Sequence, residues 1–476
     1  MKISFIKSST PKNNILIVCD EDYTLKNTML SEAEIKLVKN DFSKKMSYSI
    51  IQSNGRTVFI FKKEKGKTKF QHLENMRKIS YASNKELNRQ KISGIEIFFD
   101  VKEESERLAF IDGFLLSNYQ FLKYFSDKNE KKNSLQEIAL IAGQVKKEAV
   151  LEIQNLVNAV FTSRDLVNEP LSYLTAPQLS KEIAGISKSA GFKFEFFDKK
   201  KITALKMGGL LSVNKGSVDP PTFNILEYKS PKAKNKKPIV LVGKGVVYDT
   251  GGLSLKPTAN SMDMMKCDMA GAAAVVGLFK AIASNKLPIH VIGLIPATDN
   301  RPGGNAYVPG DVIVMHSGKT VEMLNADAEG RMILADALSY AKKYQPELVI
   351  DLATLTGAAA AAIGKEGMVG MGTASEETMS ALKKSGNQVH ERIAEMPFWD
   401  EYGTYIKSDV ADIKNIGGPH AGAITAGKFL ECFIDYPWIH LDIAGPAFLT
   451  AEDSYRGKGG SGVGVRLLYD FLSTYK

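Results

Sequence analysis

The chain has 476 residues, which is more than one hydrophobic core normally supports, so the length predicts two domains. Its composition, 44% hydrophobic and 24% charged, is that of a globular protein and excludes a largely disordered chain. The net charge is +9, and the basic excess is N-terminal: residues 1–150 hold 27 of the 62 Lys and Arg but only 19 of the 53 Asp and Glu.

The cysteines and the N-terminus bear on the cellular compartment. Cys19, Cys267 and Cys432 stand at unrelated spacings that suit neither a disulfide framework nor a zinc knuckle, so a reducing compartment is predicted. The N-terminus lacks an apolar stretch long enough for a signal peptide, and we expect no run approaching the roughly 18 residues of a membrane helix. A soluble, cytoplasmic protein without a membrane partner is therefore expected.

Short strand-like runs and helical stretches alternate in the first part of the chain. The runs ILIVCD (15–20), TVFIFKK (57–63) and GIEIFFD (94–100) predict strands, and SEAEIKLVKND (31–41) predicts a helix. Residues 1–135 are therefore predicted to form a small N-terminal α/β domain, which contains no chemical motif. Its lysine-rich segments could bind phosphates, but solvated surface is the commoner role of such segments.

A polar run, SDKNEKKNS (126–134), interrupts this pattern. The sequence after it has the apolar spacing of a long amphipathic helix that ends before Pro170. We therefore expect residues 136–163 to form a helix that connects the N-terminal domain to a second domain over residues 164–476.

The second domain alternates apolar strand runs with helical stretches. The runs include KPIVLVGKG (237–245), LPIHVIGLIPA (287–297), PELVIDLATLTG (346–357) and WIHLDIAG (438–445). This alternation predicts a larger C-terminal α/β domain with a mostly parallel central sheet flanked by helices. Ligands of such sheets collect beyond the carboxyl ends of the strands. The polar residues that follow these runs are therefore candidate site residues, among them Lys244, Asp249, Thr354 and Asp442.

Two segments of this domain carry clustered charges. In the first, Lys244, Asp249 and Lys256 lie within KGVVYDTGGLSLKP, and Asp268 follows twelve residues after Lys256. Glycines within the segment allow the backbone to turn tightly and to approach a ligand closely. Lysines and aspartates interleaved in this way form either an ion-pair network or a binding site.

The second charged segment is NADAEGR, residues 325–331. If the segment is extended, Asp327 and Glu329 point the same way, with Arg331 next along. Neighbouring carboxylates repel each other unless a cation lies between them, and the chain offers Lys, Arg or a metal as that cation. For a lone Asp or Lys a surface salt bridge is the commoner role. The four carboxylates of both segments are nevertheless enough to hold two divalent ions, an arrangement that suits hydrolysis.

Three segments resemble the signature segments of the leucyl aminopeptidase family. They are LVGKGVVYDTGGLSLKP (241–257), MKCDMAGAAAV (265–275) and NADAEGRMILADAL (325–338), and the resemblance extends from about residue 164 to residue 468. It implies a metallo-aminopeptidase that removes single residues from peptide N-termini, with residues 164–476 as its catalytic domain. The first 150 residues show no such resemblance.

The resemblance implies a site with two divalent metal ions per subunit, manganese or zinc, with magnesium or cobalt as options. The implied metal ligands are Lys244, Asp249, Asp268, Asp327 and Glu329. Lys256 is similar to the family lysine that stays protonated and polarises the scissile carbonyl. Arg331 is similar to the arginine that holds a bicarbonate ion, which serves as a proton shuttle. Lys244 would bind metal only as a neutral amine, which nearby dications favour.

The resemblance also implies how substrates bind and how the subunits assemble. The first side chain of the peptide would occupy an apolar pocket suited to Leu or Met, with Met265, Thr354, Leu355 and Gly357 in its wall. A free α-amine would reach one metal, which restricts the enzyme to N-termini. The family assembles as a hexamer, and a homo-hexamer is expected for this chain too.

Three alternatives remain at this point. The same site could serve a dipeptidase such as a cysteinylglycinase. Because the N-terminal part is basic and some bacterial relatives bind DNA, an additional DNA-binding regulatory role is possible, although a nucleic-acid partner is not expected. An inactive member of the family is disfavoured by the complete set of implied ligands. Asp336 is interpreted as a structural hydrogen-bond acceptor, and Cys267 receives no role.

Overall fold

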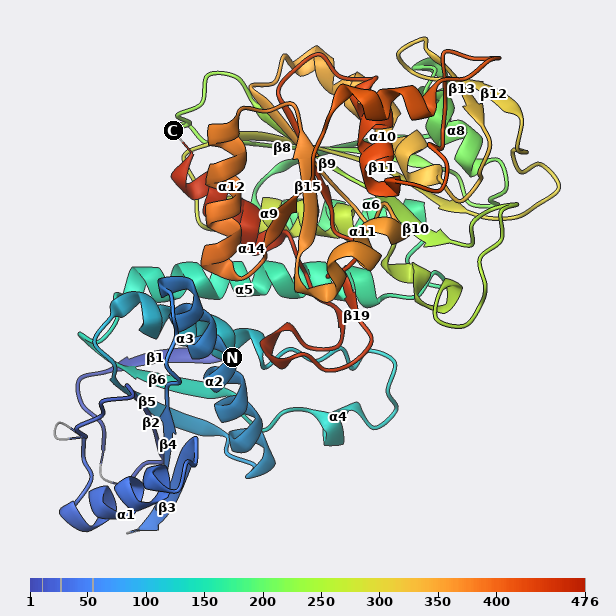
Figure 1. Cartoon of the computed structure of the whole chain (residues 1–476). Coiled ribbons are helices and arrows are strands. Elements are labelled where there is room, and N and C mark those ends of the chain that lie inside the picture. Colours follow the sequence, from blue (N-terminus) through green and yellow to red (C-terminus); the bar gives the residue numbers. More distant parts are fainter. Residues whose placement is uncertain (11, 26–27, 54, 476) are drawn as a thin grey trace. The chain divides into compact units, whose positions relative to one another are not determined.

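The computed structural model describes residues 1–10, 12–25, 28–53 and 55–475 (Figure 1). Contacts within the chain divide it into two compact units. The first comprises Met1–Val157 and Glu452–Gly457, and the second comprises Asn158–Ala451 and Lys458–Lys476. The division falls inside one helix, α5 (Lys147–Asn168).

The first unit contains a six-stranded sheet in the order β1-β6-β5-β2-β4-β3. Its strands are β1 (Lys2–Ile6), β2 (Ile15–Cys19), β3 (Tyr48–Ser53), β4 (Arg56–Lys62), β5 (Gly94–Asp100) and β6 (Glu137–Ile141). All neighbouring strands are parallel except β3 and β4. Its helices are α1 (Glu32–Ser43), α2 (Lys69–Arg89), α3 (Glu104–Leu116) and α4 (Lys128–Lys131), and the 3-10 helix η5 (Ser454–Arg456) belongs to the same unit. The predicted α/β character is confirmed.

The predicted connecting helix over residues 136–163 is wrong in its first part. Residues 137–141 form strand β6, which pairs in parallel with β1 and β5, and helix α5 begins only at Lys147. In β6 the buried residues alternate, with Ile138 and Leu140 completely buried. This two-residue period suits a strand. Pairing with a strand on each side satisfies the backbone hydrogen bonds of β6, and this tertiary context overrides the helix-like spacing of the apolar residues.

The second unit contains a nine-stranded sheet in the order β16-β15-β18-β14-β9-β11-β8-β7, and β10 also pairs with β11. Its strands are β7 (Lys193–Phe197), β8 (Thr222–Lys229), β9 (Ile239–Gly243), β10 (Gly245–Asp249), β11 (His290–Asn300), β14 (Leu348–Ala353), β15 (Met368–Gly372), β16 (Ile393–Glu395) and β18 (Trp438–Asp442). The central strands β18, β14, β9 and β11 run parallel, and antiparallel pairs lie toward both edges. The prediction of a mostly parallel central sheet is confirmed.

Helices and two small sheets complete the second unit. Its α-helices are the end of α5, α6 (Ala176–Ala190), α7 (Lys199–Ala204), α8 (Gly208–Asn214), α9 (Ala270–Ser284), α10 (Glu329–Ala341), α11 (Gly357–Ile363), α12 (Glu376–Val389), α13 (Gly422–Glu431) and α14 (Val465–Thr474). Its 3-10 helices are η1 (Met262–Cys267), η2 (Lys342–Tyr344), η3 (Gly364–Glu366) and η4 (Asp400–Ile406). The small sheets are β12 (Asp311–Val314), β13 (Thr320–Met323) and β17 (Ile413–Lys414), and β19 (Phe448–Leu449) with β20 (Gly459–Gly460).

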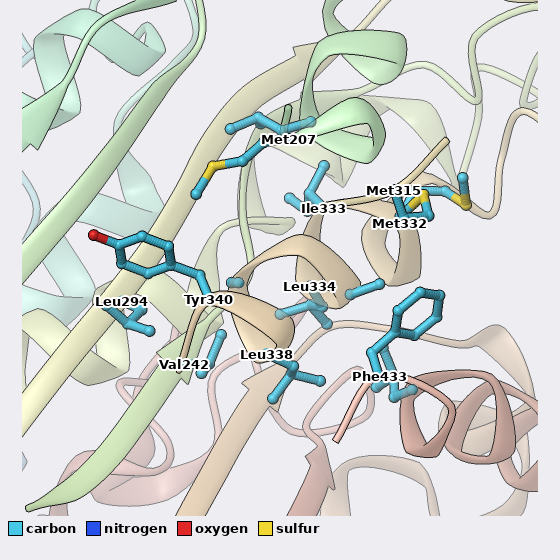
Figure 2. Close-up of a cluster of buried hydrophobic side chains, with 14 of the residues drawn as sticks. Met207, Val242, Leu294, Met315, Met332, Ile333, Leu334, Leu338, Tyr340 and Phe433 are labelled. Carbon is cyan, nitrogen blue, oxygen red and sulfur yellow. The ribbon is translucent and has the colours of Figure 1, made fainter. Parts of the chain in front are cut away.

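Successive residues of the central strands face different helices. Val242 of β9 and Leu294 of β11 belong to a buried cluster with Leu334 and Leu338 of helix α10 (Figure 2). On the opposite face a Cβ added at Gly243 would lie 2.7 Å from the Cα of Ala272. The absence of a side chain there allows helix α9 to approach the strand closely.

One expectation about hydropathy is wrong. By length and composition, the segment Met262–Ser284 could cross a membrane. However, 89% of its apolar window is buried inside the protein, where the segment contains η1 and the core helix α9. Its apolar character is explained by packing on the central sheet, because a helix covered on all sides needs no polar face.

A buried polar cluster lies on the central strands themselves. Asp351 of β14 and His440 of β18 are opposite each other in the ladder, and the Asp351 carboxylate lies 2.6 Å from His440 Nδ1. Trp438 Nε1 donates to the same carboxylate at 2.7 Å. Burial opposes charge on His440, but the attraction and hydrogen bond of Asp351 outweigh it and raise the pKa of the imidazole.

We predict that Asp351→Ala destabilises the protein strongly, because it leaves the Trp438 and His440 donors buried without their acceptor. The expected loss is about 3–5 kcal/mol of unfolding free energy, the usual cost of removing one partner of a buried charged pair. Chemical denaturation followed by circular dichroism measures it. As a control, Asp435→Ala removes a partner of Lys342 at 3.0 Å on the surface, and should cost less than about 1 kcal/mol. Equal losses in the two variants would contradict this account.

Candidate metal centre

The two charged segments meet at the carboxyl edge of the parallel strands. Lys244 follows β9, and Asp249 ends β10. Asp268 directly follows η1, and Glu329 is the first residue of α10. The backbone of Lys244 is held between neighbours, since its N–H donates to Leu352 O of β14 at 3.0 Å and its carbonyl accepts from Ala272 N of α9 at 2.9 Å.

One cavity of about 630 Å³ collects the predicted residues. All eleven predicted site residues line it: Lys244, Asp249, Lys256, Met265, Asp268, Asp327, Glu329, Arg331, Thr354, Leu355 and Gly357. The cavity lies wholly within the second unit. Residues that are up to 113 positions apart in the sequence therefore converge on one space.

Lys244 is the buried cation of the cluster. Its ammonium lies 2.8 Å from Asp268 Oδ1 and 2.9 Å from Glu329 Oε1, and it donates to Thr354 O at 2.8 Å. Burial opposes its charge, but attraction to Asp268, Glu329 and Asp249 outweighs burial and raises the pKa of the amine. Without a metal ion in the cluster, Lys244 is therefore protonated.

Lys256 is the second cation, and it approaches the other half of the cluster. Its ammonium lies 2.9 Å from Asp249 Oδ2 and is also paired with Asp327. Burial again opposes the charge, and attraction to Asp249 and Asp327 raises the pKa of this amine. The Lys256 side chain keeps 15% of its surface exposed against 3% for Lys244, so Lys256 is the lysine that a bound molecule can reach.

Three carboxylates are arranged as a metal site would require. Asp249, Asp268 and Glu329 each present an oxygen within 4.8 Å of the others, and all three are buried. Asp268 Oδ2 and Glu329 Oε2 have no hydrogen-bond partner among the described residues. Burying a carboxylate oxygen without a hydrogen-bond partner is costly. These two oxygens are not neutralised by the lysines and are free to coordinate a cation. The donor set fits divalent cations that prefer oxygen ligands.

Repulsion within the cluster is visible in the pKa values of its acids. Burial first, and then the charges of Asp249 and Glu329, raise the pKa of Asp327 to about 7 against the attraction of Lys256. The pKa values of Asp268 and Glu329 are raised for the same reasons, with Lys244 opposing the shift. Glu329 lies in the first turn of α10, where the helix dipole favours negative charge.

The expectation that NADAEGR is extended is wrong. Asp327 lies in a turn and Glu329 already belongs to α10, so their shared orientation does not come from strand alternation. Asn325 accepts a hydrogen bond from the N–H of Asp327 at 2.8 Å, which is an Asx turn. Asparagine favours such turns by bonding its own backbone two residues on, and the helix start then brings Glu329 into the same cavity.

Arg331 lies buried at the cavity, and burial lowers the pKa of its guanidinium to about 10. Its Nη1 donates to Asn415 O at 2.7 Å, whereas Nε has no partner among the described residues. The Asn415 side chain in turn accepts from Leu324 N at 2.9 Å. Arg331 can therefore bind a small anion. Asn415 holds the Arg331 side chain beside the NADAEGR turn.

The turn after β14 carries Thr354, Leu355 and Gly357. Thr354 Oγ1 donates to Asp268 Oδ1 at 2.7 Å, so it orients a carboxylate as well as lining the cavity. Asp442 accepts from Leu355 N at 3.1 Å. Asp442, which the sequence pattern marked as a candidate, does not line the cavity and instead fixes this turn.

Several residues around the cavity were not predicted from the sequence. Asn300 and Tyr307 bind the loops that carry the acids, and Cys267, which received no role, lines the cavity. The position of Asn300 at the end of β11 was a usable signal, because it is the same kind of position as that of Asp249. Asp336 accepts from Leu210 N and His316 N, both at 2.9 Å, as expected of a structural acceptor.

A parallel sheet with buried acids and unpartnered oxygens at its carboxyl edge has the arrangement of an α/β enzyme with a ligand site at that edge. The sequence model described as "Cytosol aminopeptidase family, catalytic domain" matches residues 161–469, so the chain belongs to the cytosol aminopeptidase family. The resemblance to leucyl aminopeptidases is thereby confirmed, and membership implies metal-dependent aminopeptidase activity.

Individual relatives agree with this membership. A "probable cytosol aminopeptidase" of Chlorobaculum tepidum is 49% identical over 387 residues, which are 78% of this chain and 76% of the relative. The bottromycin maturation enzyme BotP, solved in complex with Mn, is 29% identical and matches with a TM-score of 0.85 over 96% of this chain and 98% of its own. A mutant of tomato leucine aminopeptidase is 25% identical, with a TM-score of 0.87 over 100% and 97%.

Gly330 offers a local test of how the Lys244 side chain is placed. A Cβ added at Gly330 would lie 2.6 Å from both Cε and Nζ of Lys244, so Gly330→Ala should push the amine away from Asp268 and Glu329. Because the displaced amine would move away from two buried carboxylates, unfolding free energy should also fall, by about 1–3 kcal/mol. Aminopeptidase turnover should fall by about 10²-fold, the scale expected when site groups are misplaced by about 1 Å.

Gly185→Ala is the matched control for this variant. Gly185 lies within helix α6, and a Cβ there would meet nothing within 4 Å. The change should keep turnover and add about 0.5–1 kcal/mol of stability, as alanine does in a helix interior. Turnover on leucine p-nitroanilide and thermal unfolding measure both variants. Wild-type turnover in Gly330→Ala would show that the position of Lys244 does not matter.

Proposed function

We propose that this enzyme removes the N-terminal residue from peptides with two divalent metal ions held by the buried carboxylates. The supporting observation is the group formed by Asp249, Asp268 and Glu329, whose oxygens lie within 4.8 Å of one another. Asp268 and Glu329 each have an oxygen that neither lysine contacts, and a bound divalent cation would give these oxygens a partner. A related structure, that of BotP, is described as a complex with Mn, which supports manganese or zinc, with magnesium or cobalt as options.

The proposed metal ligands are the five residues of the two charged segments, Lys244, Asp249, Asp268, Asp327 and Glu329. Lys244 joins as a ligand only after losing its proton, which nearby dications would favour by repelling the ammonium. When bound, the ions supply Lewis-acid chemistry that activates a water, polarises the scissile carbonyl and accepts the free α-amine of the peptide. Because only an N-terminal residue has a free α-amine, this contact would restrict cleavage to the N-termini of peptides.

The remaining charged residues supply two further functions. Lys256 stays protonated beside Asp249 and Asp327 and is partly exposed, so its ammonium can stabilise negative charge that develops on the carbonyl oxygen. Arg331 would hold a bicarbonate ion as the proton shuttle, since its side chain lines the cavity and its buried Nε has no partner among the described residues. Among the described residues, no histidine lines the cavity, which favours a bound ion as the base.

The wall of the cavity supports a preference for Leu, Met and similar N-terminal residues. Met265, Leu355 and Gly357 are apolar or small, and Thr354 turns its hydroxyl toward Asp268. By analogy with the cytosol aminopeptidase family we further propose a cytoplasmic enzyme that assembles as a homo-hexamer. A dipeptidase such as a cysteinylglycinase remains the alternative with the same site.

Substitution of the carboxylates tests the metal assignment. Asp249→Ala and Glu329→Ala should each lose bound metal and lower turnover by a factor on the order of 10³ or more. Lys256→Ala should retain metal but lower turnover by about 10²–10³, the usual effect of removing one oxyanion donor. Metal analysis by mass spectrometry and hydrolysis of leucine p-nitroanilide report the two properties separately.

Asp263→Ala is the matched control, because Asp263 is an exposed carboxylate of η1 in the same part of the chain. It should retain both metal and turnover. Full turnover in Asp249→Ala would refute the proposed site. Circular dichroism of each variant separates loss of the site from loss of the fold.

Substrate kinetics test the proposed peptide class. Leucine and methionine amides should be hydrolysed with kcat/KM at least about tenfold above Cys-Gly, since an apolar pocket gains about 1–3 kcal/mol from a fitting side chain. N-acetylated peptides should resist hydrolysis, because acetylation removes the basic lone pair of the α-amine. A higher kcat/KM for Cys-Gly would favour the cysteinylglycinase, and cleavage of N-acetylated peptides would exclude the aminopeptidase mechanism.

A further inference from the structure

Asn300 is a completely buried residue that touches both of the segments that carry the acids. It ends strand β11, where it pairs in register with Asp249 of the neighbouring strand β10. Its side-chain Nδ2 donates to Asp249 Oδ1 at 2.8 Å and to Ala326 O at 3.0 Å. One amide group thus connects the end of β10 to the NADAEGR turn.

The chemistry of its neighbours determines how this amide is oriented. Asp249 Oδ1 and Ala326 O are both acceptors, so only the NH₂ end of Asn300 can face them. The Oδ1 end points toward Gly252, where an added Cβ would lie 2.8 Å away. A reversed amide would bring three oxygens together in a buried space, so the orientation is unambiguous.

Each acceptor of Asn300 is also held from another side. Tyr307, which is 2% exposed, donates its hydroxyl to Ala326 O at 3.0 Å, and Ala326 N donates to Ser254 Oγ at 3.0 Å. Ala326 is consequently fixed at both its carbonyl and its N–H. Asp327 and Glu329 follow Ala326 by one and three residues, so the position of the Ala326 peptide determines where the backbone places both acids.

The Asp249 carboxylate is fixed in the same way. Its Oδ1 accepts from Gly251 N and from Asn300 Nδ2, both at 2.8 Å, whereas Oδ2 lies 2.9 Å from Lys256. Two donors on one oxygen prevent rotation of the carboxylate and leave the other oxygen directed at the cation. Among the described residues, Asn300 is the side chain that binds this carboxylate without carrying a charge.

We propose that Asn300 is a positioning residue that sets the spacing between Asp249 and the acids at 327 and 329, and thereby the affinity of the site for divalent cations. This inference rests on the proposed function. Asn300 touches no substrate: it acts through Asp249 and through the Ala326 peptide. Because groups of this kind typically change metal affinity by about 10–100-fold, removing the amide should have an effect of that size.

A purely structural role for Asn300 makes a different prediction. Loss of a buried amide would then lower stability and leave the cation affinity of the folded fraction unchanged. The experiment therefore measures Mn²⁺ affinity on metal-free protein by isothermal titration calorimetry, and thermal unfolding of the same samples. Substitution with Co²⁺ adds an absorption spectrum, whose visible bands depend on the arrangement of the ligands.

Two variants and one control are compared with the wild type. Asn300→Ala removes the amide and leaves a cavity, whereas Asn300→Leu removes the amide and fills nearly the same volume. The two variants disturb the packing in different ways, so a folding failure in one does not prevent the test in the other. Asn224→Ala is the control: Asn224 is also completely buried and donates to Thr222 Oγ1 and Ile295 O, both at 3.2 Å, away from the acids. All three should lose stability, as buried amides do.

The expected result is a Kd for Mn²⁺ raised about 10–100-fold and a changed Co²⁺ spectrum in the Asn300 variants, with both unchanged in Asn224→Ala. The proposal is overturned if folded Asn300→Ala or Asn300→Leu binds Mn²⁺ like the wild type, or if Asn224→Ala weakens binding as much as they do. Failure of the wild type to bind Mn²⁺ would instead contradict the proposed function.

Discussion

Repulsion among buried carboxylates is the constraint on which this enzyme depends. Asp249, Asp268 and Glu329 are brought within 4.8 Å of one another in a space that excludes most water. Such a group is stable only if positive charge enters it, and the chain supplies Lys244 and Lys256. These lysines leave the outer oxygens of Asp268 and Glu329 without partners among the described residues, so the cluster retains capacity for further cations. The proposed divalent ions would supply the positive charge that these oxygens lack.

The sheet creates this concentration of charge because its central strands are parallel. Parallel strands place their carboxyl ends at one edge, and the helices that follow them begin there. Glycine makes the meeting tight: at Gly243 the strand lies against Ala272 of helix α9, and at Gly330 the first turn of helix α10 lies against the Lys244 side chain. Both helices are buried against the sheet, Glu329 begins helix α10, and Asp268 lies just before helix α9. Core packing and site geometry are therefore determined by the same contacts.

Neutral residues give this charged site its geometry. Asn300, Tyr307 and Asn415 contribute hydrogen bonds to backbone carbonyls and N–H groups of the turns, and Thr354 and Asn300 bind the acids directly. Uncharged donors can orient a carboxylate without neutralising it, so they position the acids and preserve the negative charge that the proposed cations require. Membership of the cytosol aminopeptidase family agrees with this arrangement, since a metal-dependent peptidase needs its ligands placed before the metal binds.

The sequence by itself determined which residue types lie at the site and the general order of strands and helices. Spacing within KGVVYDTGGLSLKP and NADAEGR is local, so Lys244, Asp249, Asp327 and Glu329 could be identified from short segments, and apolar runs predicted the parallel strands. Only the tertiary structure decided features that depend on distant partners. EIALI became strand β6 because β1 and β5 lie on either side of it, and Met262–Ser284 became a core helix because the sheet covers it. Asn300 entered the site because β10 pairs with β11, and a register shift between Val246 and Asp249 places Asn300 opposite Asp249. Local propensity acts over a few residues, whereas pairing, burial and hydrogen bonding between segments are fixed only when the whole unit has folded.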